Sequence, residues 1–209
     1  MAADPITEPM NEPMNEPHDP IDLLAALEGA SDVPLRAEYI EGIPVLTPPA
    51  DHRHNAGAFR IAVQLSSAGA HFAGIGNGYC ADTRGGAVRT LVIPDFYVMR
   101  REPTELDEAY RRAHRGWYSI ELLALAGEIT STNHETDTGP KYRGHAAAGV
   151  PVYVLVHRQE KKAYAFSDPV REEDPAKAHY ATRVEVDLGR PLPLPGPYPA
   201  LDTAPLLED

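Results

Sequence analysis

Two carboxylates that end apolar runs, followed by a lysine, are the residues of this chain best placed to do chemistry. The run 91–94 ends on Asp95, and the longer run 122–127 is followed by Glu128. Lys141 comes thirteen residues after Glu128, in the first turn of a predicted helix. Burying an uncompensated charge costs several kcal/mol, and a metal ion can compensate two carboxylates at once. The pattern therefore predicts a site for a divalent metal ion.

Each of these three residues also has a simpler interpretation. Asp95 can cap a turn where a strand ends, Glu128 can face solvent, and Lys141 can be a solvated surface residue. Their shared position at the ends of apolar strands favours one common site. A cation in the first turn of a helix also opposes the helix dipole, which indicates a negative partner close to Lys141.

The order Pro94-Asp95, Glu128, Lys141 resembles the PD-(D/E)xK nuclease superfamily, and in particular the Uma-type family of putative restriction endonucleases. The resemblance covers about residues 36–166, and its most specific stretch is 128–156. In that stretch the glutamate and the helical lysine precede an Ala-Gly-Val-Pro run and an apolar strand.

This resemblance implies a restriction-endonuclease-like fold and hydrolysis of DNA phosphodiester bonds with Mg²⁺ or Mn²⁺. Asp95 and Glu128, with the carbonyl of Ile129, would hold the metal. Glu38 would add a carboxylate, although strand alternation alone places it on the surface. Lys141 would orient or deprotonate the attacking water, or stabilise the transition state. A homodimer is also implied, since many superfamily members dimerise to cut both strands.

Further residues are secondary candidates. His54, which precedes Asn55, matches the family's histidine, although Asp51 capping a helix beside two exposed histidines is the simpler interpretation. Tyr142 and Arg143 follow Lys141 and could hold phosphate oxygens.

The chain also departs from the family pattern. His145 stands where the family commonly has tyrosine, and Thr130 takes the place of the superfamily's usual lysine. The segment 134–137, between the glutamate and the lysine, is interpreted as a solvated loop that enters the helix.

Composition limits the partners of this 209-residue chain. Its net charge of −12 argues against broad, non-specific binding of DNA, which depends on Lys and Arg. A nuclease would need a local basic patch or metal ions, and the arginines of 100–115 form the best patch in the sequence. A lone cysteine, Cys80, excludes a disulfide framework, and no run approaches the ~18–20 apolar residues of a membrane span. We therefore expect a soluble cytoplasmic protein without a membrane partner.

The elements that must position these residues follow from periodicity and turn signals. We expect an α+β (mixed α/β) fold with a mixed sheet of about seven or eight strands flanked by helices. Pro140 suits the first position of the helix that carries Lys141, and Gly149 suits its C-terminal cap. The predicted helices are 22–29, 55–68 and 137–149, and the predicted strands include 36–40, 43–47, 152–156, 163–166 and 183–188.

The domain organisation is predicted to have three parts. Residues 1–20 are an acidic, Pro-rich tail with a four-residue repeat and are expected to be disordered. Residues 21–190 form a single nuclease-like domain, and 191–209 are an extended Pro-rich segment.

Two functions remain from this reasoning. The first is a metal-dependent endonuclease that acts on DNA. The alternative is a nuclease-like module that binds nucleic acid or protein with weak or no catalysis, which the acidic surface favours. No motif codes for base readout.

Overall fold

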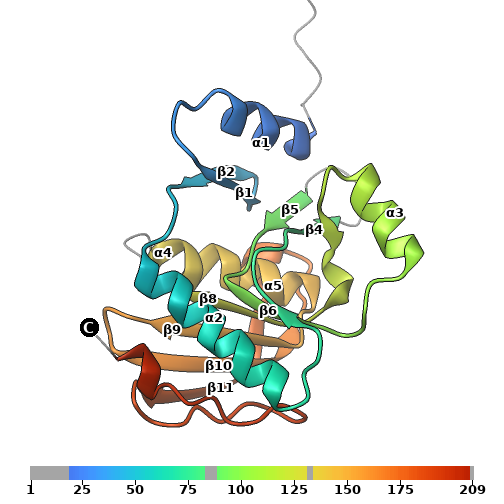
Figure 1. The fold of residues 1–209 in the computed structure, drawn as a ribbon. Coiled ribbons are helices and arrows are strands. Elements are labelled where there is room, and N and C mark those ends of the chain that lie inside the picture. Colours follow the sequence, from blue (N-terminus) through green and yellow to red (C-terminus); the bar gives the residue numbers. More distant parts are fainter. Residues whose placement is uncertain (1–18, 83–88, 131–133, 208–209) are drawn as a thin grey trace, which may run out of the picture.

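The strands in the described part of the chain form two sheets (Figure 1). The computed structural model describes residues 19–82, 89–130 and 134–207. The five-stranded sheet has the order β2 (Ile43–Thr47), β1 (Arg36–Ile40), β5 (Arg89–Val92), β4 (Tyr79–Asp82) and β7 (Tyr118–Ser119). The six-stranded sheet has the order β11 (His179–Asp187), β10 (Lys162–Val170), β9 (Val152–His157), β8 (Leu123–Ile129), β6 (Phe96–Met99) and β3 (Ala73–Gly74).

The fold class is confirmed as mixed α+β, but the predicted strand count was wrong. Within the described residues, eleven strands in two sheets replace the expected seven or eight in one, because strands of two residues, such as β3 and β7, carry no readable periodicity. The predicted strands 36–40 and 43–47 are confirmed and form a hairpin, since β1 pairs antiparallel with β2 from Arg36↔Thr47 to Ile40↔Ile43. The pair β8–β9 is parallel, and a helical segment lies between the two strands in the chain.

Two helical segments cover opposite faces of the six-stranded sheet. Helix α2 (His52–Ser67) crosses one face in Figure 1, and its Ile61 and Leu65 pack in one core cluster with Leu125 and Val154. On the other face, α5 (Tyr142–Ala148) shares a cluster with the other side of β9. The remaining helices are α1 (Pro20–Gly29), α3 (Glu105–Ala113), α4 (His134–Thr136) and the 3₁₀ turns Ile120–Leu122, Pro175–Lys177 and Ala204–Leu206.

The helix that carries Lys141 begins earlier than predicted. Helical backbone runs from His134 through α4, a π-helical turn (Asp137–Lys141) and α5. Pro140 therefore lies inside the helix and not at its first position. Because proline lacks an N–H and its ring crowds the carbonyl four residues earlier, it favours the wider π turn at this point. Gly149 ends the helix in the left-handed conformation, φ 75°, as predicted.

The structure describes more of the C-terminal end of the chain than of the N-terminal end. Residues 1–18 of the predicted disordered tail lie outside the described residues, whereas Asp19 caps α1 and Pro20 is its first residue, so those two positions were predicted wrongly. The Pro-rich segment near the C-terminus turns back on itself, since Leu192 pairs antiparallel with Leu201, both of them buried. The division into 1–20, 21–190 and 191–209 stays a prediction. None of the described helices is long and apolar enough to cross a bilayer.

His145 of α5 allows a test of this packing through pH. It is fully buried against Tyr153, and neither ring nitrogen has a hydrogen-bond partner. Burial, assisted by the charge of Lys141, lowers the pKa of His145 to about 3 from 6.5. Between these pH values the unfolded chain binds the extra proton, so stability falls as the pH falls. The penalty is about 3 kcal/mol at pH 4.

We therefore expect His145→Phe to flatten the loss of stability between pH 7 and pH 4, measured by urea unfolding followed through Trp117 fluorescence. A packing change that does not depend on pH would shift the free energy of unfolding equally at pH 7 and pH 4, and the slope of stability against pH would not change. The exposed His179, changed to Phe, serves as the control and should keep the wild-type slope. An unchanged slope in His145→Phe would show that His145 does not cause the acid sensitivity.

Candidate active site

A cavity of about 980 Å³ opens beside the start of α2, the hairpin β1–β2 and the ends of β6 and β8. Its floor consists of ionisable side chains that are at least nine-tenths buried: Glu38, Asp95, Glu128, Asp137 and Lys141. Charged groups this deeply buried require mutual compensation. The structure thus brings together all four residues predicted to be catalytic, together with a fifth.

Backbone hydrogen bonds hold Asp95 beside Glu128. Phe96 of β6 pairs with Gly127 of β8, and Asp95, which directly precedes β6, donates its N–H to Gly127 O at 3.0 Å. Its Oδ2 accepts from Ile129 N–H at 2.8 Å, so Asp95 contacts the residue on either side of Glu128. Only glycine fits at position 127, because a Cβ there would lie 2.1 Å from the Phe96 ring. Both carboxylates line the cavity at its floor.

The ammonium of Lys141 lies among three carboxylates. Its Nζ is 2.9 Å from Glu38 Oε2, 3.2 Å from Glu128 Oε1 and 3.6 Å from Asp137 Oδ1. Although burial works against the charged form, the charges of Glu128, Glu38 and Asp137 raise the pKa of Lys141 above its usual range. Three carboxylates thus serve as the negative partner that was predicted for Lys141.

Glu38 reaches the floor from the five-stranded sheet. Strand alternation suggested a surface position, but Glu38 is buried, and its Oε1 accepts a hydrogen bond from Ile93 N–H at 2.7 Å. Ile93 lies in the short link between β5 and β6, which connects the two sheets. Packing of this link over β1 covers the side that a lone hairpin would expose to water.

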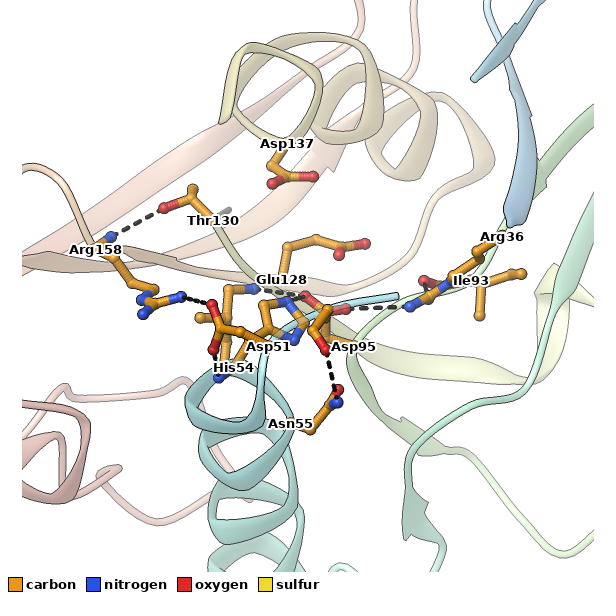
Figure 2. A network of polar contacts seen from close by, with 12 residues as sticks. Arg36, Asp51, His54, Asn55, Ile93, Asp95, Glu128, Thr130, Asp137 and Arg158 are labelled. Carbon is orange, nitrogen blue, oxygen red and sulfur yellow. Dashed lines mark hydrogen bonds and ion pairs between the residues drawn. The ribbon is translucent and has the colours of Figure 1, made fainter. Parts of the chain in front are cut away.

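Asp95 is held by donors from three directions (Figure 2). His54 Nε2 lies 2.9 Å from Oδ2, Ile129 N–H donates to Oδ2 at 2.8 Å, and Arg36 Nη1 donates to Oδ1 at 3.4 Å. Burial favours the neutral acid, but the bond and charge of His54, the charge of Lys141 and the Ile129 N–H lower the pKa of Asp95 to about 2. These contacts keep the Asp95 carboxyl ionised.

Asp95 in turn changes the pKa of His54. Burial lowers the pKa of His54, but its hydrogen bond to Asp95 and the charge of that carboxylate outweigh burial, and the pKa is raised. The side chain of Asp51 accepts from His54 N–H at 2.8 Å, which confirms the predicted helix cap, while His54 itself is buried and not exposed. Helix α2 therefore begins where its first turn can deliver an imidazole to Asp95.

Two further acids of the floor, Glu128 and Asp137, have raised pKa values. Burial raises the pKa of Glu128 well above its usual value, and the charges of Asp95, Asp137 and Glu38 reinforce the effect against that of Lys141. Burial likewise raises the pKa of Asp137 to about 6. The floor thus pairs one strongly acidic carboxyl with two weakly acidic ones.

The donor set fits a hard divalent cation. Glu128 Oε1 is buried without a hydrogen-bond partner, since Lys141 Nζ, 3.2 Å away, lies outside hydrogen-bonding geometry. A buried carboxylate oxygen without a donor suits a metal ligand, and Mg²⁺ takes one or two carboxylates beside water and phosphate. No set of three or more His, Cys, Asp or Glu side chains in the described residues is arranged as a complete metal cage.

The structure does not bring Tyr142 and Arg143 to the cavity. Tyr142 packs edge-on against Tyr153 and Phe166, and its hydroxyl accepts a hydrogen bond from Tyr180 N–H at 2.9 Å. Arg143 makes a bidentate pair with Glu41 at 2.6 and 2.8 Å. Neither side chain lines the cavity, and the expectation that these two residues hold phosphate oxygens stays a prediction.

Two residues of the site escaped the sequence analysis. Asp137 belongs to the buried floor and not to a solvated loop, and Arg36 donates to Asp95. Each had a signal: Asp137 precedes Lys141 by four residues, which places both on one side of a helix, and Arg36 precedes Glu38 by two, which places both on one face of a strand.

Comparison with known proteins agrees with this geometry. Residues 23–196 match the Uma2 family, described as putative restriction endonuclease. The chain belongs to the Uma2 family. A solved structure of a putative nuclease of DUF820 from Anabaena variabilis ATCC 29413 superposes with a TM-score of 0.56 at 16% identity, covering 88% of this chain and 96% of that one. None of the curated proteins matches the chain. The Uma2 resemblance inferred from the residues is confirmed.

Removing the ammonium from this Uma2 site tests the compensation of charge. We expect Lys141→Met to lower the free energy of unfolding by about 3–5 kcal/mol near pH 8, because it leaves buried carboxylates without a counter-charge. Adding Glu128→Gln should restore part of the loss. Urea unfolding measures both values.

Lys162 is the matched control, because its Nζ lies 2.9 Å from Glu185 on the exposed face of β10 and β11. Lys162→Met should change the free energy by no more than ~1 kcal/mol. Equal effects of the two lysine variants would show that the buried cluster has no special energetic weight.

Proposed function

We propose that the chain is a metal-dependent endonuclease that hydrolyses phosphodiester bonds of DNA. The observation that supports this most strongly is the buried trio at the cavity floor, in which Asp95 and Glu128 line one cavity and Lys141 Nζ lies 3.2 Å from Glu128 Oε1. Membership of the Uma2 family supports nuclease chemistry. The homodimer implied by the resemblance stays a prediction.

In this proposal Asp95 and Glu128 hold a Mg²⁺ or Mn²⁺ ion, and Glu38 adds a carboxylate directly or through water. When bound, the ion neutralises phosphate charge and acidifies water. The residues of the chain prepare the ligands: His54 and the Ile129 N–H fix the orientation of Asp95 and keep it ionised. Ile93 N–H donates to Glu38 Oε1 and fixes the orientation of that side chain.

Lys141 supplies the positive charge that the reaction needs beside the carboxylates. Its ammonium can donate to a non-bridging phosphate oxygen or to the attacking water, and negative charge develops on the phosphate oxygens as the bond to water forms. Asp137 and Glu38 fix the position of Nζ from two sides. Lys141 therefore acts at the reacting phosphate, and no covalent enzyme intermediate is required.

The alternative is a nuclease-like module that binds nucleic acid or protein with little or no catalysis. One observation favours it: the described residues hold no complete three-ligand cage, and the Lys141 ammonium lies between the side chains of Glu38 and Glu128. In such a module the lysine would serve only to neutralise the buried acids.

Cleavage of supercoiled plasmid distinguishes the two functions. We expect nicking and linearisation with Mg²⁺ or Mn²⁺ and none with EDTA. Glu128→Gln preserves the shape of the side chain but removes the charge, and it should lower the rate at least about 100-fold, because it removes transition-state stabilisation. Gel electrophoresis of timed samples measures the rates.

Glu185→Gln is the matched control, since Glu185 is exposed on strand β11 and does not line the cavity. It should cleave at the wild-type rate. Cleavage that survives Glu128→Gln would point to a contaminating nuclease. A folded wild type that neither cleaves DNA nor binds Mn²⁺ in calorimetry would favour the binding module.

A further inference from the structure

The charge of the cavity differs from that of the chain. Six of the 19 Lys and Arg residues line this one cavity, against five of the 31 Asp and Glu residues. The lining is therefore close to neutral on a chain with net charge −12. Four of the five acids lie buried at the floor, so the cations dominate the part of the cavity that faces solvent.

Two of these cations belong to α2. Arg53 and Arg60 are exposed and lie seven residues apart, which is two helical turns, about 10 Å, on the same face of the helix. Gly57 lies between them and lets the helix approach β8, because a Cβ there would lie only 3.1 Å from Ile129 Cδ1. Arg60 donates to Pro205 O at 2.8 Å, which fixes its guanidinium at the cavity edge.

Two more cations come from the turn between β9 and β10. Arg158 and Lys161 both line the cavity, and Arg158 Nη1 lies 3.1 Å from Asp51 Oδ2, at the start of α2 (Figure 2). This ion pair joins the turn to the helix, so the cations of both elements border the same opening. The cationic rim is defined here as Arg53, Arg60, Arg158 and Lys161.

The arginines of 100–115, the best patch in the sequence, do not contribute to this opening. They lie on or beside α3, none of them lines the cavity, and Arg101 and Arg111 pair with Asp107 and Glu108 in the same segment. Self-neutralised pairs on an exposed helix offer little net charge to a polyanion. The local basic patch that a nuclease of this net charge needs is thus supplied elsewhere, by the cationic rim.

We propose that the cationic rim binds backbone phosphates next to the phosphodiester at the floor. The substrate is then a polynucleotide strand that is bound through its backbone, without base readout. This rests on the proposed function in that the same cavity holds the reacting bond. Each rim cation that meets a phosphate releases counterions, which makes the affinity depend on salt. The acidic floor repels phosphate unless metal is present, so the rim carries the metal-independent part of binding.

The test is fluorescence anisotropy of a short fluorescein-labelled oligonucleotide, single-stranded and duplex, in EDTA over a series of KCl concentrations. Arg53→Gln/Lys161→Gln should weaken binding about tenfold and reduce the log–log salt slope by about 0.7–0.9 for each lost contact. Lys162→Gln/Arg183→Gln removes the same charge from the exposed face of β10 and β11 and should bind as wild type.

Equal weakening in both double variants would overturn the proposal, since binding would then follow net charge alone. A wild type that does not bind the oligonucleotide at low salt would overturn it as well. Plasmid cleavage by wild type and Glu128→Gln is scored separately. If binding depends on the rim but cleavage does not depend on Glu128, the nuclease proposal is rejected and the rim proposal stands. If cleavage depends on Glu128 but binding does not depend on the rim, only the rim proposal is rejected.

Discussion

The pairing of Lys141 with buried carboxylates is the interaction on which the cavity floor depends. Its ammonium lies within 3.6 Å of Glu38, Glu128 and Asp137, all of them nearly inaccessible to water. Each charge alone would cost several kcal/mol to bury. Because burial and neighbouring acids already raise the pKa of Glu128, the lysine is the group that opposes its neutralisation. The cluster can be charged and buried only as a whole.

The fold satisfies this constraint by making separate elements meet. Glu38 comes from the five-stranded sheet, Asp95 from the residue just before β6, Glu128 from the neighbouring strand β8, and Lys141 from the helical segment that connects β8 to β9. Gly127 leaves room for the Phe96 ring across β8, at the pair of residues next to the two carboxylates. Small packing details therefore set the position of the charged groups, which is why side chains far apart in sequence converge on one point.

The sequence predicted the members of the site that end apolar runs, because Asp95 and Glu128 interrupt a pattern that is otherwise purely hydrophobic. Residues whose position depends on tertiary packing gave weaker signals. The burial of Glu38 follows from the β5–β6 link lying over it, which no local periodicity reports. Asp137 looked like part of a loop because Pro140 suggested a helix start, whereas the helix accommodates Pro140 through a π turn. Where the helix meets the floor, tertiary packing therefore outweighed local propensity.

The energetics of the floor bear on the choice between enzyme and binding module. Burial, reinforced by the charge of Asp95, disfavours the ionised form of Glu128. Well-packed apolar residues in place of a buried ionic cluster are often neutral or stabilising. A module that only bound nucleic acid through the cationic rim would lose no contact if apolar residues replaced the buried ionic cluster, and it would gain stability. Asp95 and Glu128 carry that cost at the base of a cavity whose rim is already cationic, and a reaction at the floor gives it a purpose.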